Sequence, residues 1–229
     1  MSVKIVVAKY NENVEWTKHI NHPVVIYDKS DNPIPGSIHL KNVGREGETF
    51  LRHIVENYDN LDDITVFLQG NPFEHLNYLV GWRTILTDEE KQKVIHKINY
   101  DITPNSIFST FYQVLHNVPN GTNGAHCTKD CMKYFNENYQ YFTVSMGAQY
   151  IVPKQNILSR PLHVWKKMHQ DIYNDVLNGY SMEILWHFAY TGKFNNIVGN
   201  HDQVKKIHVN NNILNNDSLC VFPQQIIHF

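Results

Sequence analysis

The chain has 229 residues, of which 42% are hydrophobic and 18% are charged, and its net charge at pH 7 is −2. This balance is ordinary for a soluble globular protein that is long enough to bury a core. It excludes an overall charge that would attract nucleic acid or an anionic membrane. No stretch reaches the length of a membrane span and no targeting segment is recognisable, so we expect a cytoplasmic protein.

Three continuous apolar runs in the first hundred residues are typical of buried strands in a parallel sheet. They are VKIVVA (3–8), PVVIYDK (23–29) and ITVFLQG (64–70). Segments with helical patterns separate these runs. Such alternation favours an α/β fold with a mostly parallel central sheet and helices on both faces.

The predicted helices carry recognisable start signals. Asn11 and Asn13 are available to start a helix after the first strand. Residues 44–58 have helical spacing, with Phe50, Ile54, Val55 and Tyr58 on one face. The capping box Thr87-Asp-Glu-Glu90 predicts a further helix that extends through Ile98.

The second half of the chain has fewer clear patterns. SMGAQYIVP (145–153) is typical of a strand, and a helix is predicted for 160–178, with Pro161 near its start. The apolar stripe of that helix is expected in the core: Leu162, Trp165, Met168, Ile172 and Val176. Another helix is predicted from Ser181, its N-cap, to the residue before Gly192.

Polar clusters follow three of the predicted strands. They are Lys9-Tyr10-Asn11-Glu12, Asp28-Lys29 and Gln69-Gly70-Asn71. Ligands of open α/β sheets bind at the carboxyl ends of the strands. Each cluster alone is well explained as a solvated loop, but three clusters at one sheet edge favour a ligand site.

The cysteines offer a less specific signal. Cys127 and Cys131 lie in HCTKDC, where His126 adds a third potential metal ligand. The spacing is not that of a zinc finger and no fourth ligand is evident. Three cysteines in all are also too few for a disulfide scaffold, so we interpret them as reduced thiols.

Four stretches, in this order, resemble a family catalogued as a domain of unknown function: VVAKYNENVEW, NVGREGETFLRHIVENYDNL, TVFLQGNPFEH and GAQYIVPKQNILSRPLHVWKKM, the last followed by MEILWHF. That family is similar to divergent GT-A nucleotide-sugar glycosyltransferases. The resemblance covers roughly residues 3–190. It implies one GT-A-like domain over 1–229, with a nucleotide-binding half (1–100), an acceptor half (101–192) and a C-terminal extension (193–229).

The resemblance implies that the first half binds the nucleotide of a donor such as a UDP-sugar. The candidate nucleotide-binding residues are Tyr10, Asn11, Glu12, Asp28, Lys29, Arg45, Gln69 and Gly70. Tyr10 would stack on the base, and an acidic side chain would hold the ribose hydroxyls. Arg45, beside two glycines at a helix start, would face the diphosphate or pair with Glu46 instead. Arg160 is a second candidate contact for an anion.

The resemblance also places FLQGNP where GT-A enzymes carry the Asp-x-Asp that holds a divalent metal on the diphosphate. This chain has Asn71 there, whose neutral amide oxygen can ligate Mg²⁺ or Mn²⁺ but neutralises no charge. His75, with Glu74 beside it, is a second candidate ligand. A capping role for His75 in the turn is the alternative.

Glu183 is the candidate catalytic base because it resembles the acidic position of the family's late helix. His187 lies one turn further on and would orient Glu183. The alternative is a solvated Glu–His pair. Trp186 would either stack on a sugar or pack in the core, and we favour packing.

The leading hypothesis is a glycosyltransferase that moves a sugar from a nucleotide-diphosphate sugar to a glycan or another hydroxyl acceptor. The alternative is a non-catalytic nucleotide- or carbohydrate-binding module on a degenerate GT-A scaffold. A third hypothesis is another α/β nucleotide enzyme, such as a nucleotidyltransferase. The chain has no glycine-rich phosphate loop of the Walker or dinucleotide type, which disfavours a kinase or a dehydrogenase.

Overall fold

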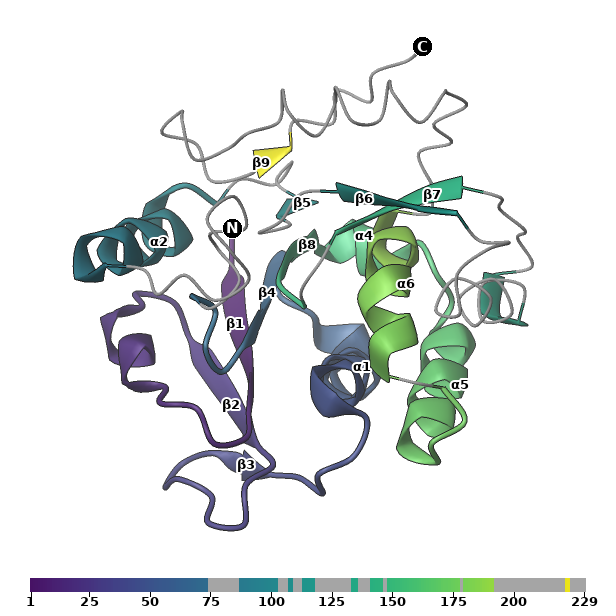
Figure 1. The fold of residues 1–229 in the computed structure, drawn as a ribbon, viewed down its shortest axis with the longest axis horizontal. Helices are drawn as coiled ribbons and strands as arrows, with labels where there is room; N and C mark the ends of the chain where they lie inside the picture. Colours follow the sequence, from purple (N-terminus) through teal and green to yellow (C-terminus); the bar gives the residue numbers. More distant parts are fainter. Residues whose placement is uncertain are drawn as a thin grey trace.

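The computed structural model describes residues 1–73, 87–102, 107–108, 113–117, 133–135, 141–145, 148–177, 179–191 and 221–222. A five-stranded sheet lies at its centre, in the order β3-β2-β1-β4-β8 (Figure 1). Its strands are β1 (Val3–Lys9), β2 (Val24–Asp28), β3 (Ile38–His39), β4 (Ile64–Gln69) and β8 (Tyr150–Pro153). The first four strands are parallel, and β8 runs antiparallel to β4. The predicted mostly parallel sheet is therefore confirmed.

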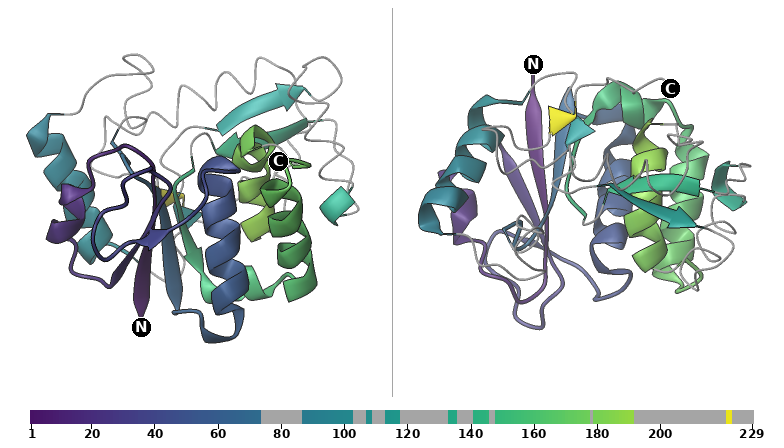
Figure 2. Two further views of the ribbon diagram at one scale, coloured as in Figure 1. Left: turned by 90° about the horizontal axis from the view of Figure 1, so that it is seen from below. Right: turned by 45° about the horizontal axis from the view of Figure 1, so that its top comes forward.

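Helices cover both faces of the sheet (Figures 1 and 2). One face packs against α1 (Arg45–Asn57) and α6 (Gly179–Thr191), and α5 (Leu162–Tyr173) packs against α1. The other packs against α2 (Asp88–Tyr100) and the 3₁₀ helix η1 (Glu15–His19). The remaining elements are α4 (Lys154–Leu158), η2 (Tyr58–Asn60), the pair β5 (Ile107–Phe108) and β9 (Val221–Phe222), and the pair β6 (Gln113–Asn117) and β7 (Tyr141–Ser145).

The central strands are apolar throughout because both of their faces are covered. In β1, Val6 faces the core under α1 and α6, while Ile5 and Val7 face the core under α2. All three side chains are completely buried. This two-sided burial is the reason why the sequence shows continuous apolar runs rather than alternation.

The start of α2 agrees with the sequence. The Thr87 hydroxyl accepts the Glu90 N–H at 3.3 Å, and the Glu90 carboxylate accepts the Thr87 N–H at 2.7 Å, so the predicted capping box is confirmed. The Asn13 side chain accepts the Glu15 N–H at 2.8 Å just before η1, but the N-cap of this 3₁₀ helix is Val14, with no hydrogen bond from a side chain. In α1, Phe50 and Ile54 are completely buried, as predicted.

Two predictions in the second half are wrong. Val176 was expected in the core, but it is 61% exposed. The helix α5 ends at Tyr173, and Asp175 has φ 58°, so the chain turns and buries Leu177 instead. The helix α6 begins at Gly179, two residues before the predicted cap Ser181, which lies buried within the helix.

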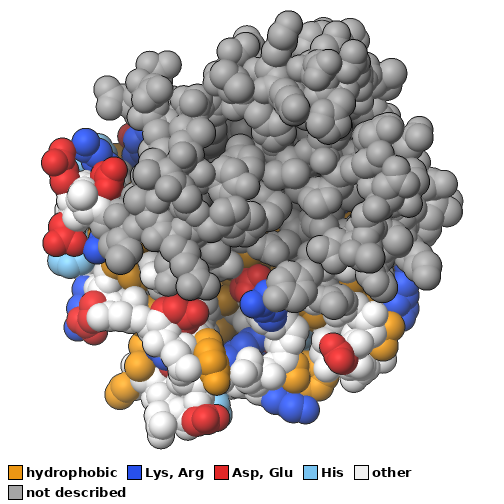
Figure 3. Space-filling model, viewed as in Figure 1, with side chains coloured by type: hydrophobic (Ala, Val, Ile, Leu, Met, Phe, Trp, Pro, Cys, Tyr) orange, Lys and Arg blue, Asp and Glu red, His pale blue; other side chains and the backbone are white. Residues whose placement is uncertain are grey.

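The surface of the described residues carries charged side chains of both signs. Acidic and basic side chains are interspersed on the coloured part of the face seen in Figure 3, in keeping with the small net charge. Among the described residues, no helix has the length and the hydrophobicity needed to cross a lipid bilayer.

Candidate functional site

The carboxyl ends of β1, β2 and β4 lie side by side at one edge of the sheet. In the strand registers, Lys9 pairs with Asp28, and Ala8 pairs with Gln69. The three polar clusters follow these strand ends, so they meet at one edge as the sequence predicts. The strand order reverses between β1 and β4, because β2 and β3 extend from the other side of β1. Ligands of open α/β sheets bind at such a switch point.

The turns after β1 and β4 meet at this switch point, in what we call the β1–β4 corner, residues 10–12 and 69–71. Glu12 bends back, so that its Oε2 accepts the Tyr10 N–H at 2.6 Å. A methyl group on Gly70 would lie 2.7 Å from the same oxygen and 3.0 Å from Glu12 Cβ, so a side chain at this position would force Glu12 to shift. Tyr10 itself is 42% exposed.

Side chains from both sides hold the corner in place. The Trp16 indole N–H donates to the carbonyl of Gly70 at 2.9 Å. Gln149, just before β8, donates from Nε2 to the carbonyl of Pro72 at 3.1 Å. Between them, Asn71 is half-buried and its Oδ1 accepts the Phe73 N–H at 3.2 Å, which is an Asx turn. The end of β4 is therefore fixed on the β1 side and on the β8 side.

Asp28, at the end of β2, is completely buried and bonded within the protein. Its Oδ2 contacts Lys9 Nζ at 2.9 Å and accepts the Ile34 N–H at 3.1 Å. Its Oδ1 accepts the N–H and the hydroxyl of Ser30 at 2.9 and 2.6 Å. Burial alone would raise the pKa of Asp28, but the hydrogen bonds from Ser30, Lys9 and Ile34 outweigh it and lower that pKa to about 2. Asp28 thus ties β2 to β1.

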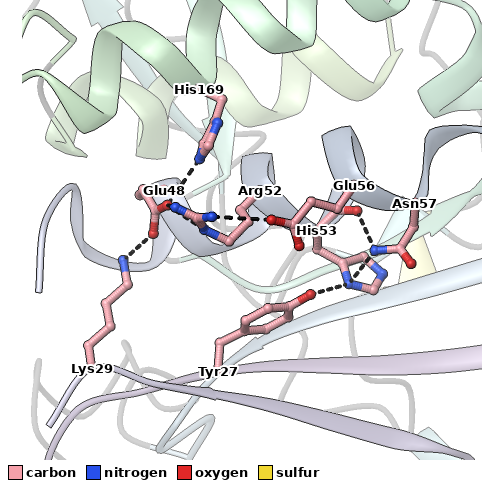
Figure 4. Close-up of polar contacts among 8 residues, drawn as sticks. All are labelled: Tyr27, Lys29, Glu48, Arg52, His53, Glu56, Asn57 and His169. Carbon is pink, nitrogen blue, oxygen red and sulfur yellow. Dashed lines mark hydrogen bonds and ion pairs between the residues drawn. The ribbon is translucent and has the colours of Figure 1, made fainter. Parts of the chain in front are cut away.

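Lys29, the next residue, belongs to a buried charge cluster that we call the Glu48 cluster: Lys29, Glu48, Arg52 and His169 (Figure 4). Glu48 is 0% exposed; its Oε2 contacts Lys29 Nζ at 2.9 Å. Its Oε1 contacts Arg52 Nη2 at 2.7 Å and His169 Nε2 at 3.0 Å. Burial alone would raise the pKa of Glu48, but His169, Lys29 and Arg52 lower it to about 2. The cluster joins β2, α1 and α5.

Lys29 also fixes the start of α1. Its ammonium donates to the carbonyls of Val43 and Arg45. Gly44 lies between these two residues. Gly44 and Arg45 have φ 60° and 54°, so two successive residues adopt the left-handed conformation. The Arg45 side chain is exposed and lies against Gly179, where a methyl group would be 3.2 Å from Arg45 Cδ. Its pairing with a diphosphate or with Glu46 stays a prediction.

A second buried polar contact, between Tyr27 of β2 and His53 of α1, lies beside the Glu48 cluster. Tyr27 Oη and His53 Nδ1 are 3.0 Å apart, and both side chains are buried (Figure 4). Burial lowers the pKa of His53 to about 4. Burial, with a contribution from Glu56, raises the pKa of Tyr27 to about 12. Both groups are therefore neutral at pH 7.

The predicted catalytic residues lie on α6. Glu183 and His187 are one turn apart on this helix. The structure does not describe their side chains, so their roles stay predictions. Trp186 between them is completely buried; its ring lies 5.9 Å from that of Phe50 and 5.0 Å from that of Tyr190. Core packing, the interpretation that we favour for Trp186, is confirmed.

Other predicted ligands are placed elsewhere or lie outside the described residues. Arg160 Nε donates to the carbonyl of Ala189 at 2.7 Å, which ties the residues after α4 to α6. Glu74, His75 and the segment HCTKDC lie outside the described residues. Within the described residues there is no group of three or more His, Cys, Asp or Glu side chains that could hold a metal ion.

The sequence pointed to no site role for three residues that organise this edge: Glu48, His169 and Gln149. For Glu48 a local signal exists, because Arg52 follows it by four residues, as in a helical ion pair. The contact between Glu48 and His169 joins residues 121 positions apart and has no local signal.

The sheet and its polar edge define the class of the protein, an α/β protein with a mostly parallel sheet and a candidate ligand site at the carboxyl ends of its strands. The chain belongs to the DUF3431 family, described as a protein of unknown function, which matches residues 5–206. This confirms the predicted membership of a family of unknown function. Comparisons with curated proteins and with solved structures found no match.

Proposed function

We propose that the protein is a glycosyltransferase that moves a sugar from a nucleotide-diphosphate sugar to a hydroxyl of a glycan or another acceptor. The observation that carries this proposal is the β1–β4 corner. There an exposed aromatic ring, a carboxylate and a glycine backbone meet at the switch point of a parallel sheet. The resemblance to GT-A glycosyltransferases adds the type of reaction.

The geometry suggests different tasks for the predicted nucleotide-binding residues. The exposed ring of Tyr10 is suited to stack on the base, and the Glu12 carboxylate to accept hydrogen bonds from the ribose. Asp28 and Lys29 are buried, with partners inside the protein, so they would act by positioning the ends of β1, β2 and α1. Asn71 would face the diphosphate.

Asn71 offers one oxygen of the kind that a hard divalent metal prefers. Asn71 Oδ1 gives one lone pair to the Phe73 N–H, and an amide oxygen has two. Asn71 would hold Mg²⁺ or Mn²⁺ together with diphosphate oxygens, and His75 is the second proposed ligand. The metal would stabilise the negative charge of the leaving diphosphate.

Glu183 is proposed as the base that accepts the proton of the acceptor hydroxyl, with His187 orienting it. The variant Glu183→Gln should keep donor binding and lower turnover by roughly 10²–10⁴-fold. Turnover near that of the wild type would instead mean that Glu183 is structural or that the reaction retains configuration.

A thermal-shift screen tests the function directly. A nucleotide sugar that binds the native state raises the melting temperature, and we expect this for UDP- or GDP-sugars, more strongly with Mn²⁺. Sugar transfer or release by the purified protein would support the enzyme. Binding without release would favour the non-catalytic module, and pyrophosphate release from a nucleoside triphosphate would favour a nucleotidyltransferase. A crystal structure with the nucleotide away from the β1–β4 corner would overturn the site.

A further inference from the structure

Gln149 carries an unpaired hydrogen-bond acceptor beside the β1–β4 corner. Its side chain is 1% exposed, and its Nε2 donates to the carbonyl of Pro72 at 3.1 Å. Its Oε1 is buried and has no hydrogen-bond partner among the described residues. Native proteins leave few buried polar atoms unpaired, because each one costs free energy. Among the described residues, this oxygen is therefore an unused acceptor at the edge of the candidate site, which a group of a bound ligand could satisfy.

The chemistry of the contact fixes which way the amide faces. A carbonyl oxygen only accepts hydrogen bonds, so the amide NH₂ of Gln149 must face Pro72. Rotating the amide by half a turn would place two oxygens against each other. The unpaired atom is therefore an acceptor, and its missing partner is a hydroxyl or an N–H group.

The position of Gln149 along the sheet edge indicates which part of a donor it would meet. Tyr150 pairs with Phe67 in the antiparallel register, so Gln149 lies beside the end of β4. Along the edge the strands follow in the order β2, β1, β4 and β8. A donor with its base on Tyr10 and its diphosphate at the end of β4 would carry its sugar toward β8 and Gln149.

We infer that Gln149 is a specificity-determining residue for the donor sugar, and that its Oε1 accepts a hydrogen bond from a sugar hydroxyl. This inference rests on the proposed function. A hydroxyl that reaches a side chain buried to this extent leaves water entirely, and such a site rejects analogues that lack the hydroxyl. Binding then requires the side chains that cover Gln149 to move, as interface side chains commonly do.

Calorimetric titration of Gln149→Met tests the inference with two pairs of probes, UDP with UDP-glucose and GDP with GDP-mannose. Methionine keeps the length of the side chain and removes its amide. We expect the affinity for the sugar nucleotide bound by the wild type to fall about tenfold. The affinity for the matching diphosphate should fall clearly less, because that ligand has no sugar and is affected only by the loss of the bond to Pro72.

Comparing the losses of affinity for the two members of a pair separates the effect of removing the acceptor Oε1 from the effect of losing the hydrogen bond to Pro72. Loss of that bond would disturb the corner and weaken both members equally. Gln155→Met, at an exposed position on α4, is the matched control and should bind both members as the wild type does. If the Met variant does not fold, Gln149→Asn, which withdraws the amide by one methylene, takes its place under the same criterion.

Equal weakening of both members, or none, would overturn the assignment of Gln149 and leave the proposed function intact. A crystal structure of the sugar-nucleotide complex with a water, and no sugar hydroxyl, on Oε1 would also overturn it. If the wild type binds neither pair, the proposed function and this inference both fail.

Discussion

The carboxyl edge of the sheet has two sides that contain the same kinds of residues and differ in burial. On the β2 side, Asp28 and Lys29 are 0% and 5% exposed, and their charges are paired within the protein. In the β1–β4 corner, Tyr10 is 42% exposed and Glu12 is half-buried. A charged strand end is therefore not sufficient evidence of a binding site. Burial with partners inside the protein distinguishes a structural charge cluster from a candidate binding site.

The buried side still matters for the corner, because adjacent residues of opposite charge reach in different directions. Asp28 reaches Lys9 at the end of β1, whereas Lys29 reaches Glu48 in α1. Lys9 also donates to the carbonyl of Tyr10 at 2.7 Å. One dipeptide thus holds the strand that leads into the corner and the helix beside it.

The largest expected effect comes from breaking the Glu48 cluster. Glu48→Gln removes the negative charge and leaves Lys29 and Arg52 beside a neutral amide. Removing one partner of a buried ion pair typically lowers the free energy of unfolding by about 3–5 kcal/mol. Urea denaturation of both proteins measures the difference.

Glu56→Gln is the matched control, because Glu56 contacts the same Arg52 from an exposed position. An exposed ion pair contributes about 0–1 kcal/mol. Equal, small losses in the two variants would show that the Glu48 cluster does not stabilise the fold, and the contrast between the two sides of the edge would fail.

The next largest effect is a loss of stability in acid that begins with His53. Burial lowers the pKa of His53 from 6.5 to about 4, so the unfolded chain takes up this proton first as the pH falls. The stability is present above pH 6.5 and is lost toward pH 4, by about 3 kcal/mol. Below pH 4.5, Glu48 and Asp28 add a second loss, because their folded pKa values are about 2.

His53→Gln should remove the first of these two losses and keep the second. Urea denaturation at a series of pH values from 7 to 3 gives the profile, and His163→Gln, at an exposed position, is the control. A profile of the His53 variant that still falls between pH 6.5 and 4.5 would assign the loss to other groups.

Local patterns predicted much of the fold because they are encoded within short segments. The three central strands, the capping box of α2 and the shared edge of the polar clusters all follow from neighbouring residues. The burial of individual charges did not, because it depends on segments far apart in the chain. His169 reaches Glu48 from α5, and Gln149 reaches the corner only because β8 joins the sheet antiparallel to β4.

A smaller effect, on binding rather than stability, is expected on the open side of the edge. Glu12→Gln removes the charge of the proposed ribose contact and should weaken the binding of a nucleotide sugar about tenfold. The free energy of unfolding should change by less than about 1 kcal/mol, since Glu12 is half-buried. Calorimetry and urea denaturation measure the two quantities, with the exposed Glu15→Gln as the control. A large loss of stability with unchanged affinity would show that Glu12, like Asp28, has a structural role and does not bind the nucleotide.

The smallest expected effect concerns Asn71 and the metal. Its Oδ1 already accepts the Phe73 N–H, so a carboxylate at this position would keep the turn and add a charge. Asn71→Asp should therefore tighten Mn²⁺ binding in the presence of UDP by about 1 kcal/mol, or roughly fivefold. Asn71→Ala should weaken it, because both the turn and the oxygen ligand are lost. Without UDP we expect weak binding in all three proteins, since the diphosphate supplies most of the negative charge. Calorimetry of Mn²⁺ with each protein, with and without UDP, decides. Equal affinities in the presence of UDP would show that Asn71 does not contact the metal, and would leave the Asx turn as its role at the end of β4.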